Sequence, residues 1–107
     1  MTNIYNILYS VNNDTYKNGV ISFTQKYHYY KIIIYNDNNQ VIFNEYIFND
    51  NLTILFNYDR LECTINDIVI KFNYCYINEW ISFTNEISNL INIKNEIRQF
   101  YNYNFFL

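Results

Sequence analysis

The sequence has no proline and no alanine, and its 107 residues include one glycine, one histidine and two arginines. A single glycine excludes the glycine-rich loops that hold phosphate groups. Because no proline-, glycine- or serine-rich stretch offers a linker, we expect a single domain over residues 1–107. One histidine and two cysteines supply too few soft ligands for a closed tetrahedral zinc site, so we expect no metal and no cofactor.

Asparagine, isoleucine, tyrosine and phenylalanine dominate what is present. Their codons are AT-rich, whereas those of proline, alanine, glycine and arginine are GC-rich. This bias indicates an AT-rich genome, such as that of a low-GC bacterium, its phages or mobile elements, or a large DNA virus. Half of the residues are hydrophobic and 21% are aromatic, which predicts a packed core and not a disordered chain.

Charge is sparse and evenly spread along the chain. Seven basic and ten acidic residues give a net charge of −3, and the scattered basic residues predict no direct contact with nucleic acid. The acidic residues are too dispersed for a dense face that imitates phosphates. Asp37, Asp50 and Asp59 fall at expected turns, where aspartate bonds its own backbone.

No segment approaches the roughly 18 consecutive apolar residues of a membrane span. Residues 1–11 lack the basic region and the continuous apolar run of a signal peptide. These features predict a cytoplasmic protein, of the producing or the host cell, that does not bind a membrane.

Turn signals rich in asparagine and aspartate recur at a regular interval, and runs rich in isoleucine, valine, tyrosine and phenylalanine lie between them. This pattern predicts an antiparallel β-meander or barrel-like sheet of six to seven strands within residues 3–76. The expected strands are about 3–11, 19–25, 27–36, 40–48, 52–58, 61–65 and 68–76. Gly19 is expected in the turn before the second strand.

Two expected strands are apolar on both faces: residues 41–48, apart from Asn44 and Glu45, and much of residues 27–35. This pattern predicts central strands covered on both sides. A hairpin turn at Asn66 and Asp67 would place Cys63 opposite residue 70, so we expect Cys63 and Cys75 to be free, buried or half-buried thiols.

From residue 78 the spacing of apolar residues changes to three and four, which predicts one amphipathic helix over about 78–100. Asn78 is the expected N-cap. Trp80, Phe83, Ile87 and Leu90 are expected to face the sheet, with Lys94 at the edge of this stripe. The predicted fold class is therefore α+β, with one long C-terminal helix packed on an antiparallel sheet.

The aromatic tail, residues 101–107, leaves two interpretations open. It either forms a last strand or packs on the sheet, or it docks on a partner or a second copy of the chain. If it docks, Tyr103, Phe105 and Phe106 join the turn acids Asp37, Asp50 and Asp59 as candidate partner contacts.

The expected order of elements is seven strands followed by a helix with an early tryptophan, whose residues 78–91 read NEWISFTNEISNLI. This order resembles the pleckstrin-homology architecture. The resemblance implies a barrel-like sheet with Trp80 closing one end. Members that bind inositol phosphates carry a basic cluster between the first strands. Here that region holds only Lys17, Lys26 and Lys31, so the resemblance does not extend to binding of a lipid headgroup.

His28 is the only histidine, and no serine or cysteine lies in a motif that would pair with it as a nucleophile. We therefore expect no enzyme activity. By elimination, we expect a protein-binding inhibitor, such as a phage or viral protein that blocks a host defence nuclease (anti-CRISPR-like), or an immunity protein that caps a toxin. The alternative is a structural or self-assembling virion component, and a homodimer is compatible with either.

Overall fold

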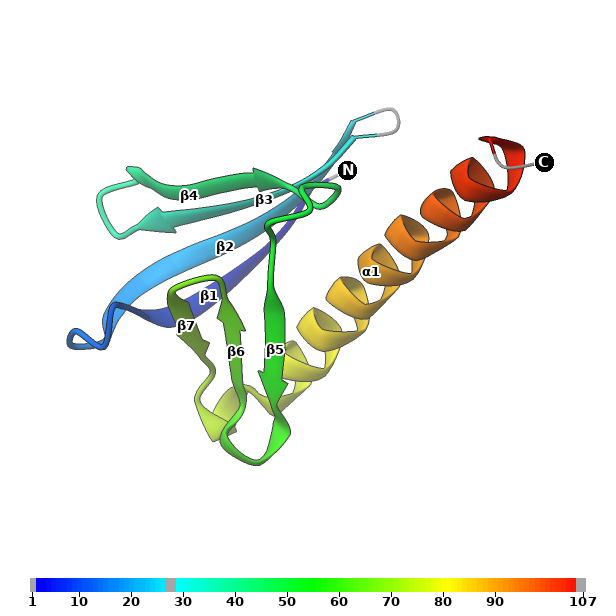
Figure 1. Cartoon of the computed structure of the whole chain (residues 1–107). Helices are drawn as coiled ribbons and strands as arrows, with labels where there is room; N and C mark the ends of the chain where they lie inside the picture. Colours follow the sequence, from blue (N-terminus) through cyan, green and yellow to red (C-terminus); the bar gives the residue numbers. More distant parts are fainter. Residues whose placement is uncertain (1, 27–28, 106–107) are drawn as a thin grey trace.

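The structure, a computed structural model, describes residues 2–26 and 29–105 and contains seven strands and one long helix (Figure 1). The strands are β1 (Thr2–Val11), β2 (Lys17–Lys26), β3 (Tyr29–Asn36), β4 (Val41–Tyr46), β5 (Ile54–Asn57), β6 (Glu62–Ile65) and β7 (Ile68–Lys71). The helix is α1 (Ile77–Phe105), and two 3-10 turns, η1 (Tyr58–Arg60) and η2 (Tyr74–Tyr76), precede β6 and α1. The predicted α+β class is confirmed, and each expected strand is present.

All seven strands form one antiparallel sheet in the order β4-β3-β2-β1-β7-β6-β5. Only the β1–β7 pairing joins strands far apart in sequence, and it places the first strand in the middle of the sheet. The sheet is not closed into a barrel, because β4 and β5 remain as its two edges. The strand number and the helix after the last strand agree with the pleckstrin-homology resemblance, whereas the barrel-like closure does not.

The prediction that residues 41–48 form a central strand is wrong. β4 lies at an edge, and Val41 and Tyr46 are 52% and 47% exposed. β3 is an inner strand, and its Ile32 and Ile34 are fully buried. An apolar pattern shows only the type of the side chains. Whether a strand lies at the centre or at the edge of the sheet depends on which strands pair with it, and the local pattern does not contain that information.

Asparagine takes the left-handed backbone conformation at the turns, as expected. Asn12, Asn13, Asn39 and Asn66 have φ values between 51° and 63°. Gly19, in contrast, was wrongly expected in a turn. It is buried inside β2 opposite Asn36, and its φ is not positive.

The predicted buried face of α1 is confirmed, because Trp80, Phe83, Ile87 and Leu90 are all at most 8% exposed. The start and the end of the helix differ from the prediction. α1 begins at Ile77, so Asn78, the expected N-cap, lies inside the helix. The preceding η2 turn is capped by Asn73, whose side chain accepts a hydrogen bond from the Cys75 amide. At its other end α1 continues to Phe105, so residues 101–105 are helical and do not form a last strand.

Two basic side chains attach α1 to the connection between β4 and β5. Lys94 is buried, and its Nζ donates to the carbonyl oxygen of Asn49 over 3.1 Å. One turn later, Arg98 forms an ion pair with Asp50. Lys94 therefore lies deeper than the expected position at the edge of the apolar stripe, and the carbonyl oxygen of Asn49 accepts a hydrogen bond from its ammonium group there.

Candidate protein-interaction surfaces

The turn acids predicted as partner contacts do not form one surface. Asp37 lies in the β3–β4 turn and Asp50 in the β4–β5 connection, at opposite ends of β4. Asp59 lies in η1, at the other end of β5, so the three connections occupy separate corners of the sheet (Figure 1). Asp50 is already paired with Arg98.

The predicted contacts in the tail lie at the far end of α1. Tyr103 and Phe105 belong to its last turns, and Phe106 lies outside the described residues. The C-terminal turns of α1 extend away from the strands (Figure 1). The structure therefore separates Tyr103 and Phe105 from the turns that contain Asp37 and Asp59.

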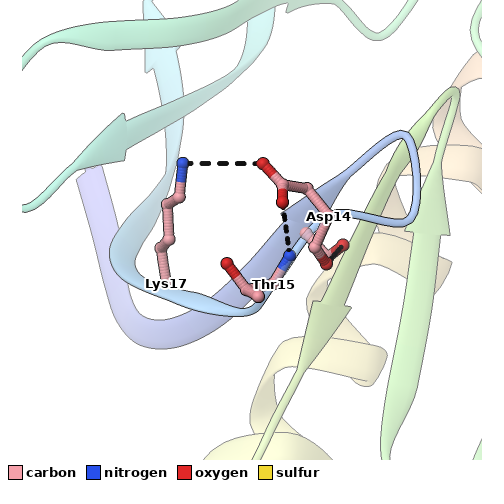
Figure 2. Close-up of polar contacts among 4 residues, drawn as sticks. Asp14, Thr15 and Lys17 are labelled. Atoms are coloured by element: carbon pink, nitrogen blue, oxygen red, sulfur yellow. Dashed lines mark hydrogen bonds and ion pairs between the residues drawn. The ribbon is translucent and has the colours of Figure 1, made fainter.

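The basic residues near the first strands are also dispersed. Lys17 Nζ lies 3.9 Å from the carboxylate of Asp14, which also accepts from the Thr15 amide (Figure 2). Lys31, which pairs with the opposite end of β2, places its Nζ 4.9 Å from the ring centre of Tyr46. The side chain of Lys26 and all of His28 lie outside the described part of the chain.

The two thiols differ in environment and do not pair. Cys63 is fully buried opposite Ile70, as predicted, and burial raises its pKa to about 12. Cys75 was expected to be buried or half-buried, but it is exposed in η2. Within residues 2–26 and 29–105, no group of three or more His, Cys, Asp and Glu side chains is placed to hold a metal ion.

Exposed aromatic and aliphatic side chains gather where α1 begins. We call this set the α1-start patch: Tyr58, Tyr74, Tyr76, Ile77 and Ile81, each between 45% and 62% exposed. Tyr58 and Tyr74 come from η1 and η2, and Ile77 and Ile81 lie one helical turn apart. Tyr58, Tyr74 and Tyr76 lie within the expected strands 52–58 and 68–76, but β5 ends at Asn57 and β7 ends at Lys71, before these residues.

The α1-start patch is held in place by its neighbours. The Tyr58 ring stacks on Phe56 with ring centres 5.5 Å apart, and it meets the buried Trp80 edge-on at 6.1 Å. The Tyr74 hydroxyl donates to the carbonyl oxygen of Asp59 over 2.6 Å. These contacts fix two exposed rings before any partner arrives, which lowers the entropy lost on binding.

A second feature is a groove along one edge of β1. β1 pairs with β7 only from Leu8 to Val11. After Lys71, Phe72 continues the pairing with the β6 side through a hydrogen bond from its amide to the carbonyl oxygen of Leu61. The chain then enters η2 at Tyr74 and does not run on beside β1. Residues 2–7 therefore pair with β2 on one side and with no described strand on the other.

A cavity of about 420 Å³ lies along this free edge. Five consecutive β1 residues line it, and consecutive residues of a strand share a cavity only when the cavity follows the strand's edge. The opposite wall comes from the end of β7, η2 and the start of α1, and its residues are Lys71, Phe72, Asn73, Tyr76 and Glu79. We call this space the β1–α1 groove.

Beyond the groove, on the same flank of α1, lies a carboxylate that is bound by β1. Glu86 accepts hydrogen bonds from the Asn3 side-chain amide and from the Tyr5 hydroxyl, both over 2.7 Å. Burial, and secondly the hydrogen bond and charge of Glu86, raise the pKa of Tyr5. Tyr5 also lines an open second cavity of about 490 Å³, bounded by α1 residues including Asn85 and Asn89.

Nothing in the local sequence pattern predicts this groove. Ile4, Tyr5 and Asn6 lie inside the expected strand 3–11, and Glu79 and Glu86 lie inside the expected helix 78–100. Only the length of β7, which ends at Lys71, exposes the edge of β1.

Comparisons with protein-family models, with curated proteins and with solved structures give no match to this chain. No helix in the described part of the chain combines the length and the apolar character that crossing a membrane requires.

Proposed function

We propose that this chain is a non-enzymatic protein-binding domain that acts by occupying the surface of a target protein. The α1-start patch carries this proposal. Tyrosine and large aliphatic residues are typical of the centres of protein interfaces, where a few anchored side chains dominate the binding energy. Exposed apolar side chains that lie together, and not singly, mark such surfaces.

The finer proposal concerns the target. The net charge of −3 favours encounter with a basic surface, such as the nucleic-acid-binding groove of a nuclease or a toxin. The protein would then inhibit its target by covering that groove, either as an antagonist of a host defence nuclease or as an immunity protein. Charge steers the encounter, and the α1-start patch supplies the contact area.

The test is a comparison of captures from lysate of the native host with tagged proteins. The double variant Ile77→Gln/Ile81→Gln removes two aliphatic side chains of the patch and retains residues that favour helix. Val41→Thr, on the remote edge strand β4, is the matched control, because Val41 is similarly exposed. We expect one stoichiometric nuclease or toxin with the wild type and the control, and its loss with the double variant.

An activity assay of the captured target then tests whether binding inhibits it. The purified target should lose activity when wild-type protein is added and keep it when the double variant is added. Retention of the same partner by the double variant would show that the α1-start patch is not the binding surface. Capture of the chain alone would contradict an inhibitory function.

Self-assembly is the second candidate, and the extent of α1 favours it. Residues 101–105, which include three aromatic residues, continue the helix beyond the strands (Figure 1). A helix end that projects from one copy can pack on another. Light scattering of the purified full chain over a range of concentrations tests this function, and a monomer at all concentrations would exclude it.

A further inference from the structure

We propose that the β1–α1 groove binds an extended segment of a partner protein, which adds to the sheet beside β1 and presents basic side chains toward α1. This inference rests on the protein-binding function proposed above, but it concerns the β1–α1 groove, which shares only Tyr76 with the α1-start patch.

The main chain of β1 specifies an extended partner. Residues 2–7 pair with β2 on one side only, so the main-chain groups on the other side face the groove. An added strand satisfies such groups with a regular ladder of hydrogen bonds, a mode of recognition that many binding domains share. This stretch of six residues, paired on one side only, spans about 20 Å, enough for a strand of ordinary length.

The space beside this edge is open to a segment of that kind. The wall opposite β1 is formed by side chains of β7, η2 and α1, and not by another strand. The side chain of Ile4 at the mouth is 63% exposed, and Tyr76 across from it is 57% exposed. An added strand would cover both apolar side chains while its backbone pairs with β1.

The charges along the groove specify a basic partner. Glu79 and Glu86 lie two turns apart on α1, along the flank that faces β1. Glu86 accepts two hydrogen bonds from neutral donors, so its negative charge remains uncompensated by those contacts. Among the described side chains that line the groove and the neighbouring cavity, Lys71 is the one basic residue, and it lies at the β7 end.

Alternate residues of an added strand would point toward these carboxylates. Lysine or arginine at those positions would pair with Glu79 and Glu86. A second copy of this chain fits less well, because residues 2–7 of its own β1 (TNIYNI) contain no basic side chain.

The experiment uses the full chain labelled with ¹⁵N and a short acetylated peptide of sequence TKVKVKT as the probe. We expect the amide protons of every second residue within 2–7, those that point away from β2, to become protected from hydrogen exchange and to show contacts to backbone protons of the peptide. Backbone N-methylation of one alternate set of peptide residues should abolish this protection, and methylation of the other set should not, because only every second residue of a strand bonds to a given neighbour.

Side-chain specificity is tested with the same readout. The acidic peptide TEVEVET should bind more weakly than the basic one. Glu79→Gln and Glu86→Gln should each weaken binding of the basic peptide by about two- to five-fold, the range for partly exposed ion pairs. Glu96→Gln, on an exposed position of α1 outside the groove, is the matched control and should leave binding unchanged.

Three outcomes would overturn the inference. The first is no protection of residues 2–7 at millimolar peptide, and the second is equal effects of the two methylated peptides. The third is pairing of β1 with β1 of a second copy, seen as a dimer. The variant Ile77→Gln/Ile81→Gln should still bind the peptide, so failure of the α1-start patch and failure of the groove are distinguishable.

Discussion

Gly19 illustrates how one residue can fix a close approach inside the sheet. A β-carbon at this position would lie 2.7 Å from the carbonyl oxygen of Tyr35 and 2.7 Å from the nearest ring carbons of Tyr9. Gly19→Ala should therefore lower the free energy of unfolding by about 1–3 kcal/mol, the usual cost of overpacking a core. Urea denaturation measures this loss, and the exposed neighbour Asn18→Ala is the control, expected within about 0.5 kcal/mol of wild type. Equal stability of Gly19→Ala and wild type would show that the sheet relaxes at this point.

The two cysteines give a second prediction at the scale of the residue. Thiolate is the reactive form, and burial raises the pKa of Cys63 to about 12, whereas Cys75 is exposed. At pH 8 the native protein should react with a chromogenic disulfide at one thiol, and the denatured protein at two. Cys75→Ser should abolish the fast native reaction, and Cys63→Ser should leave it intact. Rapid reaction of native Cys75→Ser would mean that the strands around Cys63 open readily.

At the scale of the element, α1 depends on two attachments of unequal strength. Lys94 is buried and donates to the Asn49 carbonyl, whereas Arg98 and Asp50 pair at the surface with side chains 46% and 83% exposed. Lys94→Met keeps the aliphatic stem and removes a charged hydrogen bond, so it should cost about 1–3 kcal/mol. Arg98→Met should cost about 0–1 kcal/mol, because water screens the exposed pair. Urea denaturation of both variants checks this order, which equal losses would contradict.

Local patterns predicted the elements because each strand and the helix bury one regular face. Ile68, Ile70 and Phe72 are buried as the alternation required, and Phe83 and Ile87 are buried at helical spacing. The local pattern failed where the position of a residue or strand in the sheet depends on segments that are distant in the sequence. Gly19 and the edge position of β4 depend on which strands pair, and that information is spread over the whole chain.

The candidate surfaces were less predictable for the same reason. Tyr74 and Tyr76 continue the alternation of β7, but the chain turns into η2 at Tyr74 and exposes them. The free edge of β1 exists because β7 reaches only to Leu8, and a strand sequence does not state how far its partner extends. The high tyrosine content is visible in the composition, but the exposure of Tyr58, Tyr74 and Tyr76 near the start of α1 depends on the fold.

At the scale of the whole molecule, the sheet and the first part of α1 form the packed body. The buried face of α1 runs from Trp80 to Lys94, and Arg98 is the last α1 residue with a described ion pair to the rest of the chain. At about 1.5 Å per residue, the 29-residue helix is about 43 Å long, close to the longest dimension of the molecule, 50 Å. Figure 1 shows the last turns of α1 to one side of the strands, beyond the part of the helix that packs on the sheet.

This arrangement predicts opposite effects for two changes in the same helix. Removal of residues 101–107 should change the free energy of unfolding by less than about 0.5 kcal/mol, as for other changes outside a core. Ile87→Ala, at a fully buried position of α1, should cost about 2–5 kcal/mol through the cavity it leaves. Thermal and urea unfolding of both proteins, at one low protein concentration to suppress association, measure the contrast. A large loss on truncation would place the aromatic tail in the core, and the projecting end of α1 would then be unavailable for assembly.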